Sequence, residues 1–229
     1  MKLLLFDVDA TLILTGGAGV RALNRAFKRV FNLESALDNV VLHGRTDPAI
    51  IREVFQKRLE NAFPPDPEIA RILEAYVDFL HEEIQQSDYR VLPGIIEILE
   101  EMSARSDVLM GLATGNVESG ARIKLRRGNL NRFFSFGGYG SDSENRTALV
   151  RRAAEKAAAQ RGVPIDVDSV FVIGDTPRDI EAGRSAGFKT VGVATGQYTV
   201  DQLREAGADT AISNFRDDRD YFLRSTFMA

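Results

Sequence analysis

The chain has 229 residues, 44% of them hydrophobic, and a formal charge of −4 from 29 Lys and Arg against 33 Asp and Glu. This composition is typical of a globular protein and excludes a disordered, collagen-like or coiled-coil chain. Cysteine is absent and only His43 and His81 are histidines, which excludes disulfides and Cys/His metal centres. Without a long basic block, the chain is not expected to bind nucleic acid.

The N-terminal run Met1 to Phe6 is mostly apolar, but Asp7 and Asp9 follow at once. A secretory signal needs an apolar stretch of about 7 to 15 residues, and a membrane span needs about 20. No segment of the sequence meets either condition without a charge. We therefore expect a cytoplasmic protein without a membrane partner, and the sequence is compatible with a monomer or a homodimer.

Four short runs of β-branched or bulky apolar residues predict buried strands. In chain order they span residues 3–8, 108–113, 170–173 and 190–193. Composition and spacing predict helices over residues 95–104, 118–127, 147–161 and 179–186, and a terminal helix within residues 216–229. Strands that alternate with helices form a parallel sheet that is covered on both faces. The predicted fold is a doubly wound, Rossmann-like α/β domain.

Residues 16–89 break this alternation, because they contain no apolar run that is typical of a buried strand. Apolar residues three and four apart predict helices over residues 20–30, 48–59 and 68–84. A proline-rich turn at residues 63–67 separates the last two. An all-helical segment inserted after the first strand would form a cap over the end of that strand.

The predicted domain organisation follows from this insertion. We expect an α/β catalytic core of residues 1–15 and 90–229 and a helical cap domain of residues 16–89. The glycines at positions 16, 17 and 19 are either a flexible hinge or an ordinary glycine-rich connection.

Polar residues follow three of the four predicted strands at the point where each strand ends. They are Asp7 and Asp9 after the first strand, Thr114, Gly115 and Asn116 after the second, and Asp175 and Asp179 after the third. Ligands of open parallel sheets bind beyond the carboxyl ends of the strands. If these strands are neighbours, the polar side chains meet at one edge of the sheet.

Four aspartates in one crevice would repel one another, since each like-charge pair about 4 Å apart costs roughly 4 kcal/mol at an effective dielectric near 20. The crevice therefore requires a cation. A few carboxylates combined with phosphate oxygens of a substrate suit Mg²⁺ better than Ca²⁺. A single Asp-x-Asp pair also occurs where carboxylates cap turns and helices. Three polar strand ends together instead indicate phosphoryl chemistry.

Over nearly its whole length, the chain resembles the haloacid dehalogenase-like hydrolase superfamily, within its phosphoglycolate phosphatase-like branch. The motifs that carry the resemblance are Asp7-Val8-Asp9-Ala10-Thr11, Thr114 at the end of a core strand, and Gly174-Asp175 followed by Asp179. The resemblance implies that Asp7 is the nucleophile that forms an aspartyl-phosphate. It implies that Asp9 is the general acid and base.

The remaining motif residues have roles that the same resemblance implies. The hydroxyl of Thr114 would bind a phosphoryl oxygen, together with backbone N–H groups near Gly115 and Asn116. The metal ligands would be Asp175, a carboxylate oxygen of Asp7 and the backbone carbonyl of Asp9. Asp179 would ligate the Mg²⁺ or support its ligands.

The resembled family has a lysine at the start of the helix before the last aspartate motif, and this chain departs from that pattern. We expect Arg146 to supply the charge, because it opens a predicted helix and can bind phosphate with its forked guanidinium. Lys124 and Lys156 are competing candidates, but their positions in predicted helices favour solvated faces. Ala10 replaces a commoner glycine, and its methyl group is tolerated if the turn keeps a negative φ.

Residues 43–48 are the most informative part of the predicted cap. Gly44 is followed by a helix start in which Thr46 or Asp47 is the expected N-cap. Arg45, at the tip of a lid over an anionic crevice, is a candidate for binding a substrate carboxylate or phosphate. The corresponding region faces the active site in capped phosphatases of the resembled family. The two histidines are expected at the surface or in packing positions.

The resemblance implies a Mg²⁺-dependent phosphatase that acts on a small phosphorylated metabolite, such as phosphoglycolate or a sugar phosphate. A dehalogenase is disfavoured, because that branch of the family lacks the aspartate that Asp9 supplies. A sugar phosphomutase uses the same core residues and is the nearest rival. Two functions without catalysis are also compatible with these residues: a receiver-type signalling domain, which is typically shorter and has no helical insert, and an inactive binding protein with the same fold.

Overall fold

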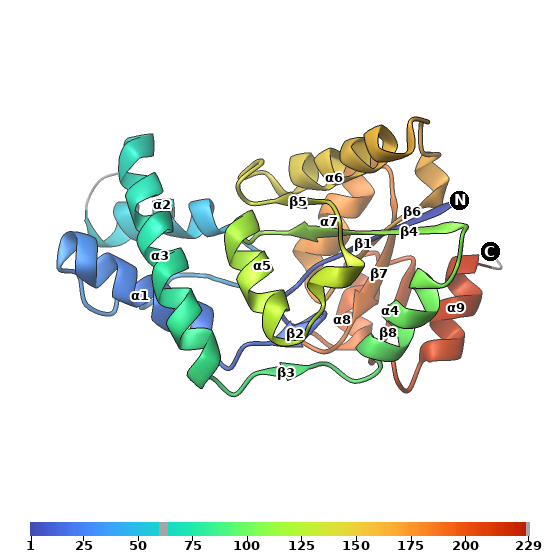
Figure 1. Cartoon of the computed structure of the whole chain (residues 1–229), viewed down its shortest axis with the longest axis horizontal. Coiled ribbons are helices and arrows are strands. Elements are labelled where there is room, and N and C mark those ends of the chain that lie inside the picture. Colours follow the sequence, from blue (N-terminus) through green and yellow to red (C-terminus); the bar gives the residue numbers. More distant parts are fainter. Residues whose placement is uncertain (60–63, 228–229) are drawn as a thin grey trace.

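The computed structural model describes residues 1–59 and 64–227, and a six-stranded parallel sheet forms its centre (Figure 1). The strands are β1 (Lys2–Phe6), β4 (Val108–Thr114), β5 (Gly137–Tyr139), β6 (Val170–Gly174), β7 (Lys189–Val193) and β8 (Thr210–Ile212). Their order across the sheet is β5-β4-β1-β6-β7-β8. Because β1 lies between β4 and β6, its carboxyl end adjoins the ends of both. The predicted doubly wound α/β fold is confirmed.

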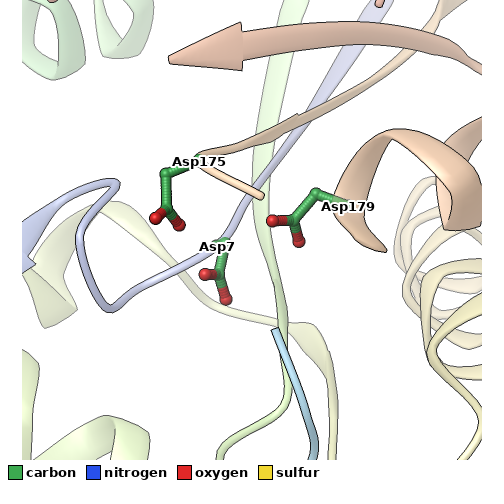
Figure 2. A group of neighbouring side chains, drawn as sticks. All are labelled: Asp7, Asp175 and Asp179. Carbon is green, nitrogen blue, oxygen red and sulfur yellow. The ribbon is translucent and has the colours of Figure 1, made fainter. Parts of the chain in front are cut away.

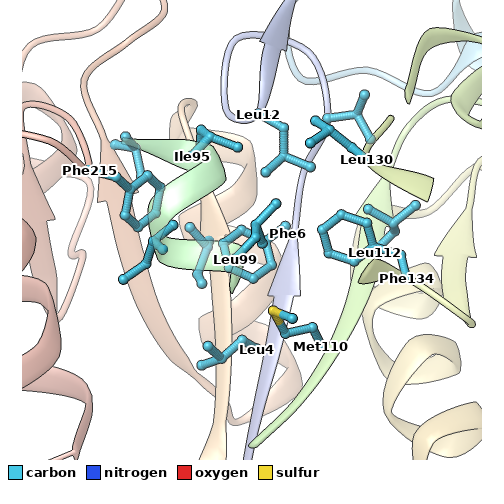
Figure 3. Close-up of a cluster of buried hydrophobic side chains, with 14 of the residues drawn as sticks. Leu4, Phe6, Leu12, Ile95, Leu99, Met110, Leu112, Leu130, Phe134 and Phe215 are labelled. Atoms are coloured by element: carbon cyan, nitrogen blue, oxygen red, sulfur yellow. The ribbon is translucent and has the colours of Figure 1, made fainter. Parts of the chain in front are cut away.

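Both faces of the sheet are buried under helices, as is usual for parallel sheets. Leu4 and Phe6 of β1 belong to the cluster in Figure 3, with side chains of α4 (Ile95–Ser103), α5 (Glu118–Arg127) and α9 (Arg219–Phe227). Leu3 and Leu5 pack on the other face, against α6 (Arg146–Arg161) and α7 (Pro177–Ala186). The apolar run in β1 is unbroken because alternate side chains enter two different cores.

Two strands of the sheet have no counterpart among the four that the sequence predicts. β5 and β8 are each three residues long, and β5 begins with Gly137 and Gly138, which add no apolar side chain. Both strands lie at the edges of the sheet. The first strand is also shorter than predicted, because the Val8 carbonyl already accepts the turn N–H groups of Leu12 and Ile13.

The turn after β1 places Ala10 at a φ of +58°. The condition of a negative φ, under which the methyl group would be tolerated without strain, is therefore not met. A left-handed conformation costs a residue with a Cβ roughly 1–2 kcal/mol. The Ala10 N–H donates to the Ile13 carbonyl at 2.8 Å, and the Ala10 carbonyl accepts the Thr195 hydroxyl at 2.6 Å. These two hydrogen bonds hold the strained turn in place.

Residues 16–89 contain the three helices predicted there, α1 (Ala18–Phe31), α2 (Asp47–Arg58) and α3 (Asp66–Gln86). They enclose a separate apolar cluster in which Phe27 and Phe55 are buried. Val117, the N-cap residue of α5, and Ile123 within this helix join the cluster. α5 therefore packs against the sheet on one side and against the helical segment on the other.

A short antiparallel ribbon marks the place where the chain enters and leaves the helical segment. Its strands are β2 (Ile13–Leu14) and β3 (Arg90–Val91). Gly16 follows β2 at a φ of +54°, and a Cβ at this position would lie 2.8 Å from backbone atoms of Asp88. Glycine is therefore needed for the two connections to lie this close together. The division into core and cap domains stays a prediction.

The helix ends follow the signals in the sequence. Asn145 caps α6 by accepting the Ala148 N–H at 3.0 Å, and Gly162 and Gly187 end α6 and α7 with positive φ. A short helix, α8 (Val200–Glu205), packs against β7 and β8.

No helix in the described ranges is long and apolar enough to cross a membrane. Phe63 of the predicted turn and the last two residues of the predicted terminal helix lie outside the described residues.

Candidate active site

The polar residues predicted at three strand ends meet at the carboxyl edge of the sheet. The register pairs the last residue of β1 with Leu112 of β4 and with Ile173 of β6. Asp7 therefore leaves β1 beside the ends of both neighbours, where Thr114 and Asp175 lie. The Asp7 N–H donates to the Ile173 carbonyl at 2.9 Å, which extends the sheet by one bond. Asp7, Asp175 and Thr114 are buried.

Three of the predicted acidic residues form one group. Asp7, Asp175 and Asp179 each offer a carboxylate oxygen within 4.8 Å of the others (Figure 2). Burial is the main cause that raises the pKa of Asp7 to about 7 and the pKa of Asp175 to about 8. Neighbouring aspartates add to both shifts, and Arg146 opposes them. The protein alone therefore disfavours the fully ionised form of these carboxylates, and a divalent cation bound by their oxygens would stabilise that form.

Arg146 opens α6 and reaches this acidic group. Its Nη2 lies 3.0 Å from Oδ1 of Asp7, and its Nε donates to Oδ1 of Asp179 at 2.8 Å. Nη1 donates to the Gly44 carbonyl at 3.3 Å, so Arg146 also touches the helical segment. Burial disfavours the charge on Arg146, but Asp179 and Asp7 outweigh it and raise its pKa above the usual value. The structure thus brings Arg146 to the place predicted for it, while its catalytic role stays a prediction.

Asp179 is held on both carboxylate oxygens. Oδ2 accepts the Thr176 N–H at 3.0 Å and the Thr176 hydroxyl at 2.7 Å, and Oδ1 accepts from Arg146. Asp175 has a looser contact, a 3.4 Å hydrogen bond from the Thr11 hydroxyl to its Oδ1. Asp179 therefore positions Arg146 and the start of α7, and Asp175 is better placed to bind a ligand.

Asp9 lies in a second polar group with Asn116 and Lys124. The Lys124 Nζ is 2.6 Å from Oδ2 of Asp9 and donates to Oδ1 of Asn116 at 2.6 Å. The Asn116 Nδ2 donates to the same Asp9 oxygen and to the Thr114 hydroxyl, at 2.8 Å in each case. Asn116 thereby connects the end of β4 to the residues that follow β1.

The expectation that Lys124 lies on a solvated face is wrong. Lys124 is 5% exposed, because α5 is covered on two sides. Burial lowers the pKa of Lys124, but the carboxylate of Asp9 and its other neighbours raise it above the usual value. Lys156 is partly exposed and forms an ion pair with Asp142 at 2.8 Å, away from the acidic group.

The sequence does contain a signal that places Lys124 inside the protein. Within α5, Ala121 and Leu125 pack in the cluster under the sheet, and Ile123 packs in the cluster of the helical segment. Apolar residues on two opposite sides of a short helix indicate that it is buried between two layers. A lysine in such a helix requires a partner inside the protein.

The predicted helix start in residues 43–48 is present. Thr46 is the N-cap of α2, and its hydroxyl accepts the Ala49 N–H at 3.4 Å. Asp47 and Pro48 are the first two residues of the helix. The Asp47 side chain therefore does not cap α2.

Asp47 instead joins the helical segment to the end of β4. Its N–H donates to the Gly115 carbonyl at 2.8 Å, and its Oδ2 accepts the Val117 N–H at 2.9 Å. A Cβ on Gly115 would collide with the Arg45 carbonyl oxygen, so only glycine lets the two segments meet. Burial raises the pKa of Asp47 to about 6, against the opposing effect of Lys124.

Arg45 lines the cavity beside the acidic group, but its charge is already paired. The guanidinium forms an ion pair with Glu53 of α2 and donates to the Ala49 carbonyl at 3.4 Å. Its role in binding a substrate anion stays a prediction. His43 and His81 are both exposed, and His43 contacts Gln197 with 2.6 Å between the two Nε2 atoms.

A cavity of about 220 Å³ lies between the sheet edge and the helical segment. We call its polar side the floor, which consists of Asp7, Asp9, Thr114, Asn116, Lys124, Arg146 and Asp175. We call the side built from residues 16–89 the wall, which includes Val20, Leu23, Leu37, Leu42, Ile50 and Tyr76. The residues predicted to attack, protonate and bind a phosphoryl group therefore face one cavity.

A doubly wound sheet with buried carboxylates and an arginine at its carboxyl edge is typical of α/β enzymes that bind anions with a cation. Residues 4–193 match the family model described as haloacid dehalogenase-like hydrolase. The match covers most of the chain, so the chain belongs to this family. The resemblance predicted from the aspartate and threonine motifs is confirmed.

Individual relatives match over nearly the whole length. The chain is 27% identical to a phosphoglycolate phosphatase from Agrobacterium fabrum, over 93% of this chain and 88% of the relative. It is similar in structure to CbbY from Rhodobacter sphaeroides in complex with phosphate, with a TM-score of 0.73, 19% identity and coverage of 95% and 96% of the two chains. It is also similar to a protein from Bacteroides vulgatus provisionally described as a β-phosphoglucomutase (TM-score 0.72, 20% identity, 99% and 90% coverage). The two structures show the fold, and the family with its phosphatase relative confirms the predicted enzyme class, a phosphoric monoester hydrolase.

Proposed function

We propose that the chain is a Mg²⁺-dependent phosphatase that hydrolyses a small phosphorylated metabolite through an aspartyl-phosphate on Asp7. The observation that carries this proposal is the buried contact of Arg146 with Asp7, beside Asp175 and next to a cavity. Phosphoglycolate and sugar phosphates are the substrates that the family resemblance suggests, so both belong in the first panel of esters. We further propose that residues 16–89 act as a cap domain on a catalytic core of residues 1–15 and 90–229.

The metal would be held by carboxylate oxygens of Asp7 and Asp175 and by the backbone carbonyl of Asp9. When bound, Mg²⁺ supplies positive charge that reduces the repulsion between these carboxylates and the phosphate oxygens. The raised pKa values of Asp7 and Asp175 support such a site, because each reflects burial of a carboxylate near other carboxylates. Oxygen ligands of this kind suit a hard ion.

The reaction would begin at Asp7. Its carboxylate oxygen forms a bond to phosphorus while the bond between phosphorus and the substrate oxygen breaks. Asp9 donates a proton to that oxygen, which leaves as an alcohol. Asp9 then takes a proton from a water molecule, whose oxygen attacks phosphorus, releases inorganic phosphate and restores Asp7. The side chain of Asp9 is 41% exposed, and its hydrogen bonds from Lys124 and Asn116 both go to Oδ2.

Arg146 and Thr114 would bind the transferred phosphoryl group. The guanidinium of Arg146 lies 3.0 Å from the attacking carboxylate, so its charge would stabilise negative charge that develops on the phosphoryl oxygens. The Thr114 hydroxyl accepts hydrogen bonds from the backbone and side chain of Asn116, which directs its own proton elsewhere. A phosphoryl oxygen in the cavity would accept that proton, assisted by N–H groups near Gly115 and Asn116.

Phosphate release tests the proposal. With Mg²⁺, the protein is expected to release inorganic phosphate from esters in a panel of p-nitrophenyl phosphate, phosphoglycolate, sugar phosphates and alkyl phosphates. EDTA and the Asp7→Asn substitution should each abolish the release. Asp201→Asn, at a side chain that is 84% exposed, is the matched control and should leave the rate unchanged. Absence of release from every ester would refute the proposal.

A sugar phosphomutase is the second candidate function, favoured by the structural similarity to the Bacteroides protein. The two functions share the attack by Asp7 and differ in the fate of the aspartyl-phosphate. A phosphomutase would convert one sugar phosphate into an isomer without releasing phosphate. The phosphatase would release phosphate in equal amount to the alcohol.

A further inference from the structure

The floor and the wall of the cavity would contact different parts of a substrate. A phosphate bound at Asp7 lies against the floor, so the leaving group extends toward the wall. Most of the side chains in the wall are apolar: Val20, Leu23, Leu37, Leu42 and Ile50 are aliphatic and Tyr76 is aromatic, whereas His43, Arg45 and Asp47 are its polar members. Tyr76 is 2% exposed and packs in the same apolar cluster. The leaving group would therefore meet mainly hydrocarbon.

The cations around the cavity are already paired. Three Lys or Arg side chains line it among the described residues. Lys124 pairs with Asp9, Arg146 pairs with Asp7, and Arg45 pairs with Glu53. A second anionic group on the substrate would therefore enter the wall without a free cationic partner. An unpaired charge in an apolar environment costs several kcal/mol more than an apolar group there.

We infer that the physiological substrate is the phosphate monoester of an alcohol with an apolar body and without a second anionic group. This inference rests on the proposed phosphatase function and deepens it. It distinguishes the chain from an enzyme that selects phosphoglycolate, whose carboxylate would face the aliphatic wall. Burial of the apolar body against the wall would supply the selectivity.

A homologous series of substrates tests the inference. Ethyl, propyl and butyl phosphate have primary alcohols as leaving groups, so their chemical reactivity is alike and their differences report contacts with the wall. We expect kcat/KM to rise about fourfold with each added methylene, the factor that burial of one such group provides. Butyl phosphate should exceed phosphoglycolate and glucose 6-phosphate by at least about tenfold.

A charge placed in the wall provides a second test. Val20 is 39% exposed at the start of α1, so the Val20→Arg variant should fold. It should raise kcat/KM for phosphoglycolate relative to butyl phosphate by about tenfold, because it offers the carboxylate a partner. Val41→Arg is the matched control, since Val41 is 52% exposed in the same helical segment and is not among the cavity residues. The control should leave the ratio unchanged.

The outcomes separate the inference from the proposed function. A flat alkyl series, or faster hydrolysis of phosphoglycolate than of butyl phosphate, would overturn the inference and leave the phosphatase standing. In the second case the backbone at the start of α1, where Gly17 and Gly19 line the cavity, would be the carboxylate-binding element. Absence of phosphate release from all esters would overturn both.

Discussion

The floor and the wall of the cavity are built by different kinds of structure. Most floor residues lie at or just after strand ends, while Lys124 and Arg146 come from α5 and α6. Hydrogen bonds of 2.6–2.8 Å fix Asp9 and its partners Lys124 and Asn116. Wall residues come from helices and their connections and are held mainly by apolar packing. Under the proposed function, this difference implies that residues at the sheet edge would carry out the reaction and that the inserted helices would select the ester. Changes in the floor should slow all substrates equally.

The largest effect is expected for Asp175, which we propose as a metal ligand. The Asp175→Asn substitution removes a charged oxygen ligand, and we expect kcat to fall by about 1000-fold for every ester in the panel, with weaker activation by Mg²⁺. Titration of the rate with Mg²⁺ measures both effects. A loss confined to one class of ester would show that Asp175 belongs to substrate selection rather than to the reaction.

Two substitutions of Arg146 separate the effect of its positive charge from the effect of its forked guanidinium group. The Arg146→Met variant should lose about 100-fold or more in kcat, because it removes the positive charge beside Asp7. It should also unfold at lower temperature, since two buried carboxylates lose their partner. Arg146→Lys keeps the charge without the fork and should recover part of both losses. Equal rates in the two variants would contradict the proposed role, and steady-state kinetics with thermal unfolding provide the measurements.

Lys124 is expected to have a smaller effect, because it acts on Asp9 and not on the phosphoryl group. The Lys124→Met substitution should lower kcat by about tenfold for all esters with little change in KM, since Asp9 loses its 2.6 Å partner. Lys156→Met is the matched control and should retain full activity, because Lys156 pairs with Asp142 at the surface. A change in substrate preference, with kcat unchanged, would instead assign Lys124 to the wall.

The smallest effect concerns stability at the contact between the two regions. Because burial raises the pKa of Asp47 from 3.8 to about 6, the folded state binds its proton more tightly than the unfolded state. The stability that this proton provides is complete below pH 3.8 and is lost as pH rises through about 6. Asp47→Asn, which still accepts the Val117 N–H, should reduce this loss by on the order of 1–2 kcal/mol between about pH 4 and 7.

Urea unfolding at about pH 4 and about pH 7 measures how the free energy of unfolding depends on pH. Asp201→Asn, at an exposed position, is the control. The Asp47→Asn variant should be more stable than the wild type at the higher pH and similar to it at the lower one. A variant that is less stable at the higher pH would show that the carboxylate charge itself holds the helical segment on the sheet, through the nearby Lys124.

The floor was largely predictable from the sequence, because one rule governs it. Parallel strands place their carboxyl ends together, so Asp7, Thr114 and Asp175 could be assigned to one edge before the register was known. Arg146 was assigned through the family resemblance, which implies a basic residue at the start of the helix before the last aspartate motif, and the structure shows it as the first residue of α6. Local patterns sufficed because each residue is fixed by its own strand or helix.

The features that were not predicted depend on contacts between distant parts of the chain. Apolar residues on two sides of α5 indicate that Lys124 is buried, but its partner Asp9 lies 115 positions away in the sequence, so the pattern within the helix does not identify it. Ala10 keeps a positive φ because bonds to Ile13 and Thr195 hold its turn. The edge strand β5 contains two glycines, so its position follows from pairing with β4 and not from its composition.

The antiparallel ribbon of β2 and β3 would allow the helical segment to be deleted from this protein. Leu14 and Arg90 are paired residues on antiparallel strands, so a two-residue type I′ turn could join them directly and form a β-hairpin. The resulting chain would lack the three inserted helices and would need new polar side chains at Val117 and Ile123, which those helices cover. Its aspartates would be exposed to bulk water at the carboxyl edge of the sheet, where esters of any shape could reach them.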